Sequence, residues 1–371
     1  MEKNKLRRTP LYGKHIAHGG KLIPFAGYEL PIQYIGVIAE HVAVRQKAGL
    51  FDASHTAKLQ ITGPDATRNL QHLLTGDFTD MAVGEARYSL MCDDAGGILD
   101  DLVAYKFAED SYFLAANAAN RERDTAWIGS HLSGSARLED CSDKVAEIAI
   151  HGPAAEKILS RLASPTEIPA QCNTFGRDIE VAGIGTLLSR SDDTGEEGFE
   201  IFVNNHDAEN LWEALLDVGA EFGLVPAGIG ALDTLRFEAG VPACGRELTD
   251  GITPFEAGLD FAVQMDKDDF IGKHALAERS IPARRRAGLR VNGPGVARGN
   301  CEVLADTGRV IGKTTSGVHC PYLGASYAMA LLEVGYTSPG TAVEVDARGG
   351  RIAAEVVPLP FYRPRTDSPT G

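Results

Sequence analysis

The spacing of apolar and polar positions changes along the chain and predicts a mixed α+β body over most of its length. Apolar residues recur at helical intervals over 42–50 and 66–74, whereas 59–62 and 148–150 are short β-rich runs. Each of these two strands is followed by Gly-Pro and then by a helical run, so a strand-turn-helix unit occurs twice. The repeat indicates two related α+β sub-domains within 6–278.

Towards the C-terminus the pattern changes to short apolar runs separated by glycine turns. This pattern is typical of a small antiparallel barrel or sandwich. The segment 279–286 is rich in charge and contains proline, so we expect a linker there, followed by a barrel domain over 287–364. The runs that predict barrel strands are 289–291, 303–304, 310–311, 328–332, 342–345 and 353–357.

Composition and charge exclude several classes of protein. The 371 residues are 44% hydrophobic and 23% charged, which is enough apolar material for two or three domains. The net charge of −15 argues against nucleic acid and anionic membrane as partners. No run approaches the ~18 apolar residues of a membrane span, and the N-terminal segment lacks the apolar core of a signal peptide. The six cysteines form no C-x-x-C pair, so we expect reduced thiols and a cytoplasmic protein.

The segment 87–105 holds the first candidate for chemistry. Two apolar runs flank Asp-Asp-Ala-Gly-Gly, which predicts a β-hairpin with a glycine turn. Because side chains alternate along a strand, Asp100 and Asp101 point to opposite faces, and Asp101 shares its face with Val103 and Tyr105. An acid on an apolar face is costly to bury without partners, so Asp101 is either a site residue or a solvent-facing turn acid.

Two further segments place polar side chains next to predicted strands. Asn117 and Asn120 follow an apolar strand and precede a helical run, so they are either helix caps or paired amides that read the edge of a heterocycle. Glu200 lies between Phe199 and Ile201 and points to the opposite face from both. It is either a surface strand residue or a buried carboxylate that accepts two hydrogen bonds from an amidine-like edge, such as that of a pterin.

Taken together, these motifs resemble the T-protein family of the glycine cleavage system. The resemblance covers about residues 6 to 364 in the family's order and is most specific at Gly96-Gly97-Ile98-Leu99-Asp100-Asp101-Leu102, Asn117-Ala118-Ala119-Asn120 and Thr194-Gly195-Glu196-Glu197-Gly198. It extends over further matching segments, which are 6–12, 18–21, 25–28, 31–34, 49–55, 235–240, 270–273, 315–317, 339–341 and 360–361.

The resemblance implies a fold, a reaction and a set of roles. It implies three domains in a cloverleaf around a central hole that holds tetrahydrofolate, the third domain being the barrel. It also implies that the methylene of an aminomethyl group on lipoylated H-protein passes to tetrahydrofolate with release of ammonia. Asp101 matches the family's essential aspartate and Glu200 the glutamate that grips the pterin. Tyr88, Tyr105 and Asn120 match positions that line the folate pocket, Asn117 is the second amide of the pair, and no metal is expected.

Three positions depart from the family pattern. Asp193 stands where tyrosine is usual, Leu232 where an arginine contacts folate, and Val241 where an aromatic residue is frequent. If folate binding is retained, Arg236 or Arg246 is expected to compensate for the missing arginine.

Two alternatives to aminomethyl transfer follow from the family, and one partner hypothesis follows from the charge pattern. One alternative is a tetrahydrofolate-dependent demethylase of a small S-methyl or O-methyl donor such as dimethylsulfoniopropionate. The other is a folate-binding iron–sulfur assembly scaffold, but its characteristic cysteine is absent from 269–276. The basic run 284–286 predicts either an ordinary solvated linker or a patch that steers an acidic H-protein.

Overall fold

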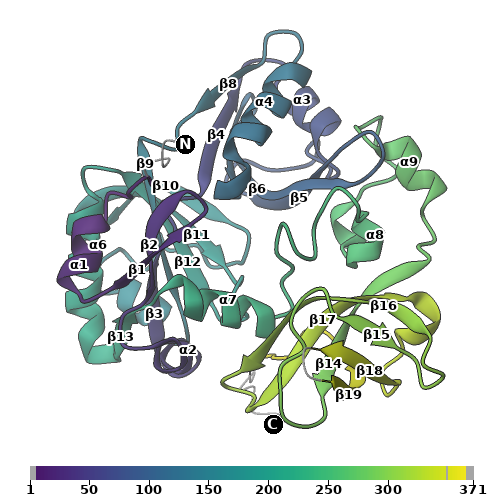
Figure 1. Cartoon of the computed structure of the whole chain (residues 1–371). Coiled ribbons are helices and arrows are strands. Elements are labelled where there is room, and N and C mark those ends of the chain that lie inside the picture. The colour runs from purple at the N-terminus through teal and green to yellow at the C-terminus, as the bar shows by residue number, and fades with distance from the viewer. Residues whose placement is uncertain (1–5, 348–349, 365–371) are drawn as a thin grey trace, which may run out of the picture.

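The computed structural model describes residues 6–347 and 350–364, which form two α+β units and a β-barrel. Figure 1 shows the three parts arranged around a common centre, with α7 (Ile229–Glu238) and the chain that follows it passing between them. The predicted α+β cloverleaf with a C-terminal antiparallel barrel is therefore confirmed.

The first α+β unit is built on a six-stranded sheet in the order β10-β11-β12-β9-β3-β13. One face of this sheet forms an apolar core in which Ile148, Phe199, Ile201 and Trp212 are fully buried. The short strand β13 pairs parallel with β3, whereas β3, β9, β12, β11 and β10 pair antiparallel. The elements of the unit are α1 (Tyr12–Ala17), β1 (Lys21–Phe25), β2 (Tyr28–Gln33), α2 (Val37–Gln46), β3 (Ala48–Asp52), β9 (Val145–His151), α5 (Ala155–Leu159), β10 (Phe175–Val181), β11 (Ile184–Ser191), β12 (Gly198–Asn204), α6 (Ala208–Gly219), η2 (Ala220–Phe222) and β13 (Leu224–Pro226).

The second α+β unit is a five-stranded sheet in the order β5-β6-β7-β4-β8, with α3 and α4 packed on it. Its core includes Leu59, Leu70, Leu114 and Ile128, which come from two strands and both helices. Its elements are β4 (Ala57–Thr62), α3 (Ala66–Leu73), β5 (Ala86–Cys92), β6 (Ile98–Ala108), β7 (Ser111–Ala116), η1 (Ala118–Asn120), α4 (Arg121–His131) and β8 (Arg137–Asp140).

The barrel is closed by six antiparallel strands in the order β14-β17-β16-β15-β18-β19, and β19 pairs back onto β14. Leu289, Val303 and Val345 are fully buried inside it, as the apolar runs predict. Its elements are β14 (Arg284–Val291), β15 (Glu302–Leu304), β16 (Val310–Cys320), β17 (Ala325–Glu333), η4 (Val334–Tyr336), β18 (Ala342–Ala347) and β19 (Gly350–Val357). Three short helices join the body to the barrel, and these are α8 (Pro254–Ala257), η3 (Asp260–Ala262) and α9 (Lys273–Glu278).

The repeated strand-turn-helix unit is present as β4-α3 and β9-α5. Its glycines are required in both copies, because Gly63 and Gly152 have φ of +110° and +124°. A Cβ on Gly63 would lie 2.3 Å from the carbonyl oxygen of Ser135, and one on Gly152 would lie 2.5 Å from that of Val44. The helix predicted over 42–50 is partly wrong, since α2 ends at Gln46 and residues 48–50 belong to the fully buried strand β3. A buried strand and a buried helix turn have the same continuous apolar pattern.

The expected linker over 279–286 needs correction at its C-terminal end. Strand β14 begins at Arg284, so the three arginines belong to the barrel rather than to a solvated linker. Arg284 Nε donates to Glu256 at 2.7 Å, and Arg285 pairs with Asp260. Arg286 donates to the carbonyl oxygens of Ala257 at 2.8 Å and Gly240 at 2.6 Å. These arginines fix the barrel to the connecting segment, and Arg284 and Arg285 keep 44% and 43% of their side chains exposed.

Within the described residues, no helix combines the length and the apolar composition that crossing a lipid bilayer requires.

Candidate functional site

The β5-β6 hairpin positions the two acids as strand alternation predicts. Asp101 is paired with Leu90 and Asp100 with Met91 in the antiparallel register. Asp100 is fully buried, whereas Asp101 lies on the other face and is partly exposed. Tyr88, two residues before Leu90 on β5, reaches the same face as Asp101.

Asp101 accepts hydrogen bonds from two of the predicted site residues. The hydroxyl of Tyr88 donates to its Oδ2 at 3.2 Å, and Nδ2 of Asn117 donates to its Oδ1 at 2.8 Å. Burial and the neighbouring charge of Asp100 raise the pKa of Asp101 to about 7, although the two hydrogen bonds act in the opposite direction. A carboxyl group with this pKa can both accept and release a proton near neutral pH.

Asp100 is held by a different set of donors. The backbone N–H of Asn117 donates to its Oδ2 at 3.2 Å, and Nδ2 of Asn117 and Nδ2 of Asn120 donate to its Oδ1 at 2.8 and 2.7 Å. Asn117 and Asn120 occupy the N-cap positions of η1 and α4, but neither side chain makes a capping hydrogen bond. The side-chain amides therefore donate hydrogen bonds to the two carboxylates and do not cap the helices.

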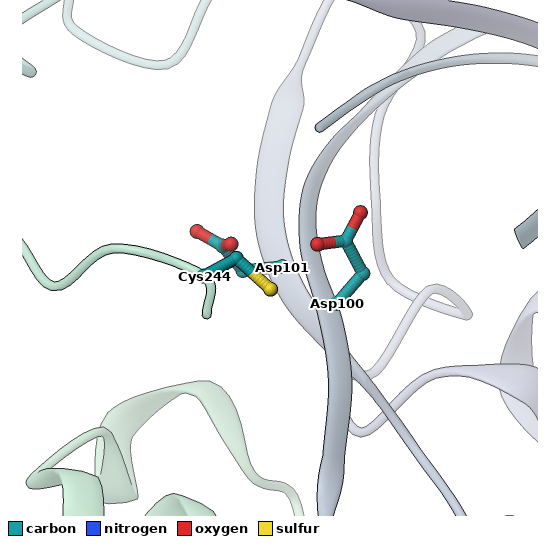
Figure 2. Close-up of side chains that lie close together, drawn as sticks. All are labelled: Asp100, Asp101 and Cys244. Carbon is teal, nitrogen blue, oxygen red and sulfur yellow. The ribbon is translucent and has the colours of Figure 1, made fainter. Parts of the chain in front are cut away.

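Cys244 completes this cluster and was not predicted from the sequence. Figure 2 shows its side chain beside Asp100 and Asp101, and the three ligand-type atoms lie within 4.8 Å of one another. Nδ2 of Asn120 also lies 3.2 Å from its sulfur. Burial raises the pKa of the Cys244 thiol to about 12, which favours the neutral thiol over the thiolate. A cysteine between alanine and glycine in a loop gives no periodic signal that would have identified it.

Glu200 lies on β12 in the first α+β unit, on the face opposite the apolar core. Its neighbours Phe199 and Ile201 are fully buried in that core, as predicted from alternation. Its Oε1 lies 3.2 Å from Nε2 of His151 and accepts from the Ser191 hydroxyl at 3.2 Å. Both contacts involve Oε1, and the side chain keeps 11% of its surface exposed.

The side chain of Tyr105 is buried between aromatic rings and is not exposed to solvent. Its ring is 4% exposed and packs between Phe113, Phe175 and Phe202 at centroid distances of 6.0, 5.3 and 5.6 Å. These rings come from both sheets, so the cluster joins the two α+β units. Burial and the charges around it, Glu200 among them, raise the pKa of Tyr105 well above its usual value.

The charge of Asp193 acts on residues near Asp101 and on residues near Glu200. Its side chain is exposed to solvent, yet surrounding protein and the charge of Glu200 raise its pKa to about 6. Its negative charge also contributes to the raised pKa of both Tyr88 and Tyr105. Asp193 therefore lies within electrostatic range of both groups of site residues, which are not joined to one another by hydrogen bonds within the described part of the chain.

The other two departures, Leu232 and Val241, lie on α7 and just after it. Leu232 is partly buried and packs against an apolar cluster that includes Val44, Phe51 and Ala149. Val241 is half-buried, and its carbonyl oxygen accepts from Arg236 at 3.0 Å. The remaining donors of Arg236 are directed at Asp233. Arg246 also pairs with Asp233, at 3.2 Å, but keeps 47% of its side chain exposed.

Comparison with known proteins gives matches over both parts of the chain. Residues 11–267 match the family model described as the GCVT N-terminal domain, and residues 284–363 match the glycine cleavage T-protein C-terminal barrel domain. The aminomethyltransferase of Anoxybacillus flavithermus is 43% identical over 362 residues, which are 96% of this chain and 99% of that protein. The aminomethyltransferase of Bacillus cereus is 45% identical over 361 residues, which are 96% and 98% of the two chains.

A solved structure shares the whole arrangement. The crystal structure of glycine cleavage system aminomethyltransferase T from Bartonella henselae superimposes with a TM-score of 0.89 at 32% sequence identity. The match covers 97% of this chain and 99% of that one, so all three lobes have counterparts there.

Proposed function

Because the chain belongs to the glycine cleavage T-protein family and is an aminomethyltransferase, we propose that its co-substrate is tetrahydrofolate and its aminomethyl donor is lipoylated H-protein. The observation that supports this most directly is that Asp101, on β6 of the second α+β unit, accepts hydrogen bonds from Tyr88 and Asn117, while Glu200 lies on β12 of the first unit. The two groups would hold the reacting nitrogens and the pterin edge of one ligand. Nothing favours the demethylase alternative.

The reaction needs protons to be moved as bonds to carbon change. The methylene carbon exchanges its bonds to the donor nitrogen and sulfur for bonds to N5 and N10 of tetrahydrofolate, and the two released protons leave on ammonia and on the dihydrolipoyl thiol. Asp101 would take up and deliver a proton at the reacting nitrogen, since its pKa of about 7 suits both roles. As a carboxylate it would also stabilise the positive charge that develops on the transferred carbon.

The other residues would bind and orient the co-substrate. The Glu200 carboxylate would accept from the ring N–H and amino group of the pterin, while His151 and Ser191 fix the side chain through Oε1. Tyr88 and Asn117 would hold the Asp101 carboxylate in one orientation, and Asn120 would support Asn117 by its bond to Asp100. Tyr105 would form the aromatic wall between the two sheets.

We also propose a reducing, cytoplasmic location, which is consistent with the six free cysteines.

A coupled assay tests the proposed function. Purified protein is incubated with tetrahydrofolate and H-protein that carries the aminomethyl group on its lipoyl arm, and methylene-tetrahydrofolate and ammonia are measured together. We expect both products in equal amounts, and none with H-protein that lacks lipoate. Conversion of tetrahydrofolate with dimethylsulfoniopropionate or another methyl donor, and not with H-protein, would contradict the proposal.

A further inference from the structure

Asp124 is a buried acid that the proposed mechanism does not use. It lies in the first turn of α4, and its side chain is fully shielded from solvent, whereas the neighbouring Arg123 is exposed. Nε of Arg123 lies 3.5 Å from its Oδ1, close to the upper limit of a hydrogen bond. Its Oδ2 has no hydrogen-bond donor among the residues that the structure describes. An ionised carboxylate in this place would be unfavourable.

Helix and strand periodicity direct Asp124 towards Asp100. Asp124 and Ile128 are four residues apart on α4 and therefore share one face of the helix. Asp100 and Leu102 alternate with Asp101 along β6 and share one face of the sheet. Because Leu102 and Ile128 belong to the same buried core, these two faces pack on each other. The carboxyl groups of Asp100 and Asp124 meet there in hydrogen-bond contact, and both residues are fully buried.

Two buried carboxyl groups in contact repel each other strongly if both are ionised, so one proton is expected between them. Asp100 accepts three hydrogen bonds from Asn117 and Asn120, whereas among the described residues Asp124 has the long contact with Arg123. Donors favour the ionised form of a carboxyl group, so Asp100 keeps the charge and Asp124 keeps the proton. Burial, and then the contact with Asp100, raise the pKa of Asp124 to about 9, which agrees with this assignment.

We propose that Asp124 is a positioning residue of the reaction centre, a neutral carboxyl group whose O–H donates to Asp100 in the active protein. This donor adds to the three hydrogen bonds that Asp100 accepts, so Asp100 holds the side-chain amide of Asn117 in a fixed orientation. The same amide donates to Asp101 at 2.8 Å. Asp124 therefore acts on Asp101 through two other residues. Its effect on turnover rests on the proposed function, whereas its protonation does not.

Ionisation of Asp124 should disturb this arrangement. The charged groups that face it are Asp100 from β6 and Arg123 from its own helix. A second negative charge would repel Asp100 and would replace a donor by an acceptor, so turnover should fall as the pH rises through the pKa of Asp124. The elements α3 and β8 pack against α4, and their titratable side chains are paired elsewhere or exposed: Asp140 pairs with Arg121, Arg68 with Asp65 and Glu139 with Lys144, while His72 and Arg137 are exposed.

Infrared spectroscopy tests the protonation without any substrate. Asp101, Glu147 and Asp193 also have raised pKa values, of about 7, about 7 and about 6, and are largely ionised at about pH 8. We expect the unmodified protein to show a carboxylic-acid C=O band at this pH, and Asp124→Asn to lack it. The control Glu122→Gln, which changes an exposed acid in the same turn of α4, should keep the band. Absence of the band from the unmodified protein, or its persistence in Asp124→Asn, would overturn the proposal.

Turnover in the coupled assay tests the positioning role. Asp124→Ala removes the donor and should lower kcat by about tenfold, the worth of one hydrogen bond to a charged group. The KM for tetrahydrofolate should change little, because Asp124 does not touch the substrate. Asp124→Asn keeps an N–H donor of similar shape, so it should restore most of the lost kcat and should lack the fall of kcat at alkaline pH. Glu122→Gln should keep both the kcat and the alkaline fall.

The outcomes separate this proposal from the proposed function. An alkaline fall that persists in Asp124→Asn, or equal losses of kcat in Asp124→Ala and Asp124→Asn, would overturn the positioning role. If Asp124→Ala does not fold, the pH profile of Asp124→Asn beside that of the unmodified protein still decides the matter. Absence of aminomethyl transfer by the unmodified protein would instead overturn the proposed function, and the infrared band would still decide the protonation of Asp124.

Discussion

Asp100 and Asp101 share one side-chain amide, because Nδ2 of Asn117 donates to Oδ1 of each at 2.8 Å. The two acids are adjacent in sequence and point to opposite faces of β6, yet this contact couples them. Asp100 has further donors in Asn120 and in the backbone of Asn117, whereas within the described residues Asp101 has Tyr88 besides the shared amide and its own backbone. The geometry assigns Asp100 a positioning role and leaves Asp101 available to exchange a proton.

Substitution of the two acids should therefore have unequal effects on turnover. Asp101→Asn should lower kcat by at least ~10²-fold, because it removes a positioned acid-base group. Asp100→Asn keeps an oxygen acceptor for the amides, and its kcat should stay within about tenfold of the unmodified protein. Rates are measured in the coupled assay, with circular dichroism to confirm that both variants fold. Equal losses in the two variants would contradict the assignment.

The pH dependence should separate the two acids more sharply. If the ionised Asp101 is the active form, kcat rises with pH through a midpoint near its pKa of about 7. The negative charge of Asp100 helps to raise this pKa, so Asp100→Asn removes a repulsion and lowers it. The acid limb of the profile should then move to lower pH by about one unit.

The control for this measurement is Asp110→Asn, which neutralises an exposed acid in the turn between β6 and β7. Its profile should match that of the unmodified protein. A midpoint that stays fixed or moves upward in Asp100→Asn would show that Asp100 does not act on Asp101.

The local sequence pattern was sufficient to predict the β5-β6 hairpin. It was insufficient to predict which residues surround the two acids. The alternation that places Asp101 opposite Asp100 depends only on strand geometry, so it could be predicted. The shared amide of Asn117 depends on the pairing of β6 with β7, and Cys244 comes from a loop 143 positions after Asp101 in sequence (244 minus 101). Contacts of this kind arise from tertiary packing and have no local pattern. The same reason explains why 284–286 resembled a linker, since the acids that pair with those arginines lie on α8 and η3.

Glu200 should control the affinity for the pterin rather than the chemical step. Glu200→Gln removes the charge and one of the acceptors, and a hydrogen bond to a charged group contributes roughly 1.5–3 kcal/mol. We expect the dissociation constant for tetrahydrofolate to rise by about 10- to 100-fold. A suitable control is Glu180→Gln, which lies on β10 of the same sheet and is exposed. Unchanged calorimetric binding in Glu200→Gln would remove this residue from the proposed site.

Leu232→Arg tests whether the departure from the family pattern has weakened the folate site. Leu232 is partly buried against Val44, Phe51 and Ala149, and an arginine there replaces part of this apolar contact with a charged side chain. We therefore expect a loss of about 1–3 kcal/mol in the free energy of unfolding. We expect less than a threefold gain in affinity for tetrahydrofolate monoglutamate. Leu232→Met is the matched control, since it keeps the volume and the apolar character and should leave both quantities nearly unchanged. A tenfold gain in affinity for Leu232→Arg without loss of stability would contradict this expectation. It would mean that an arginine at 232 can still contact folate in this chain.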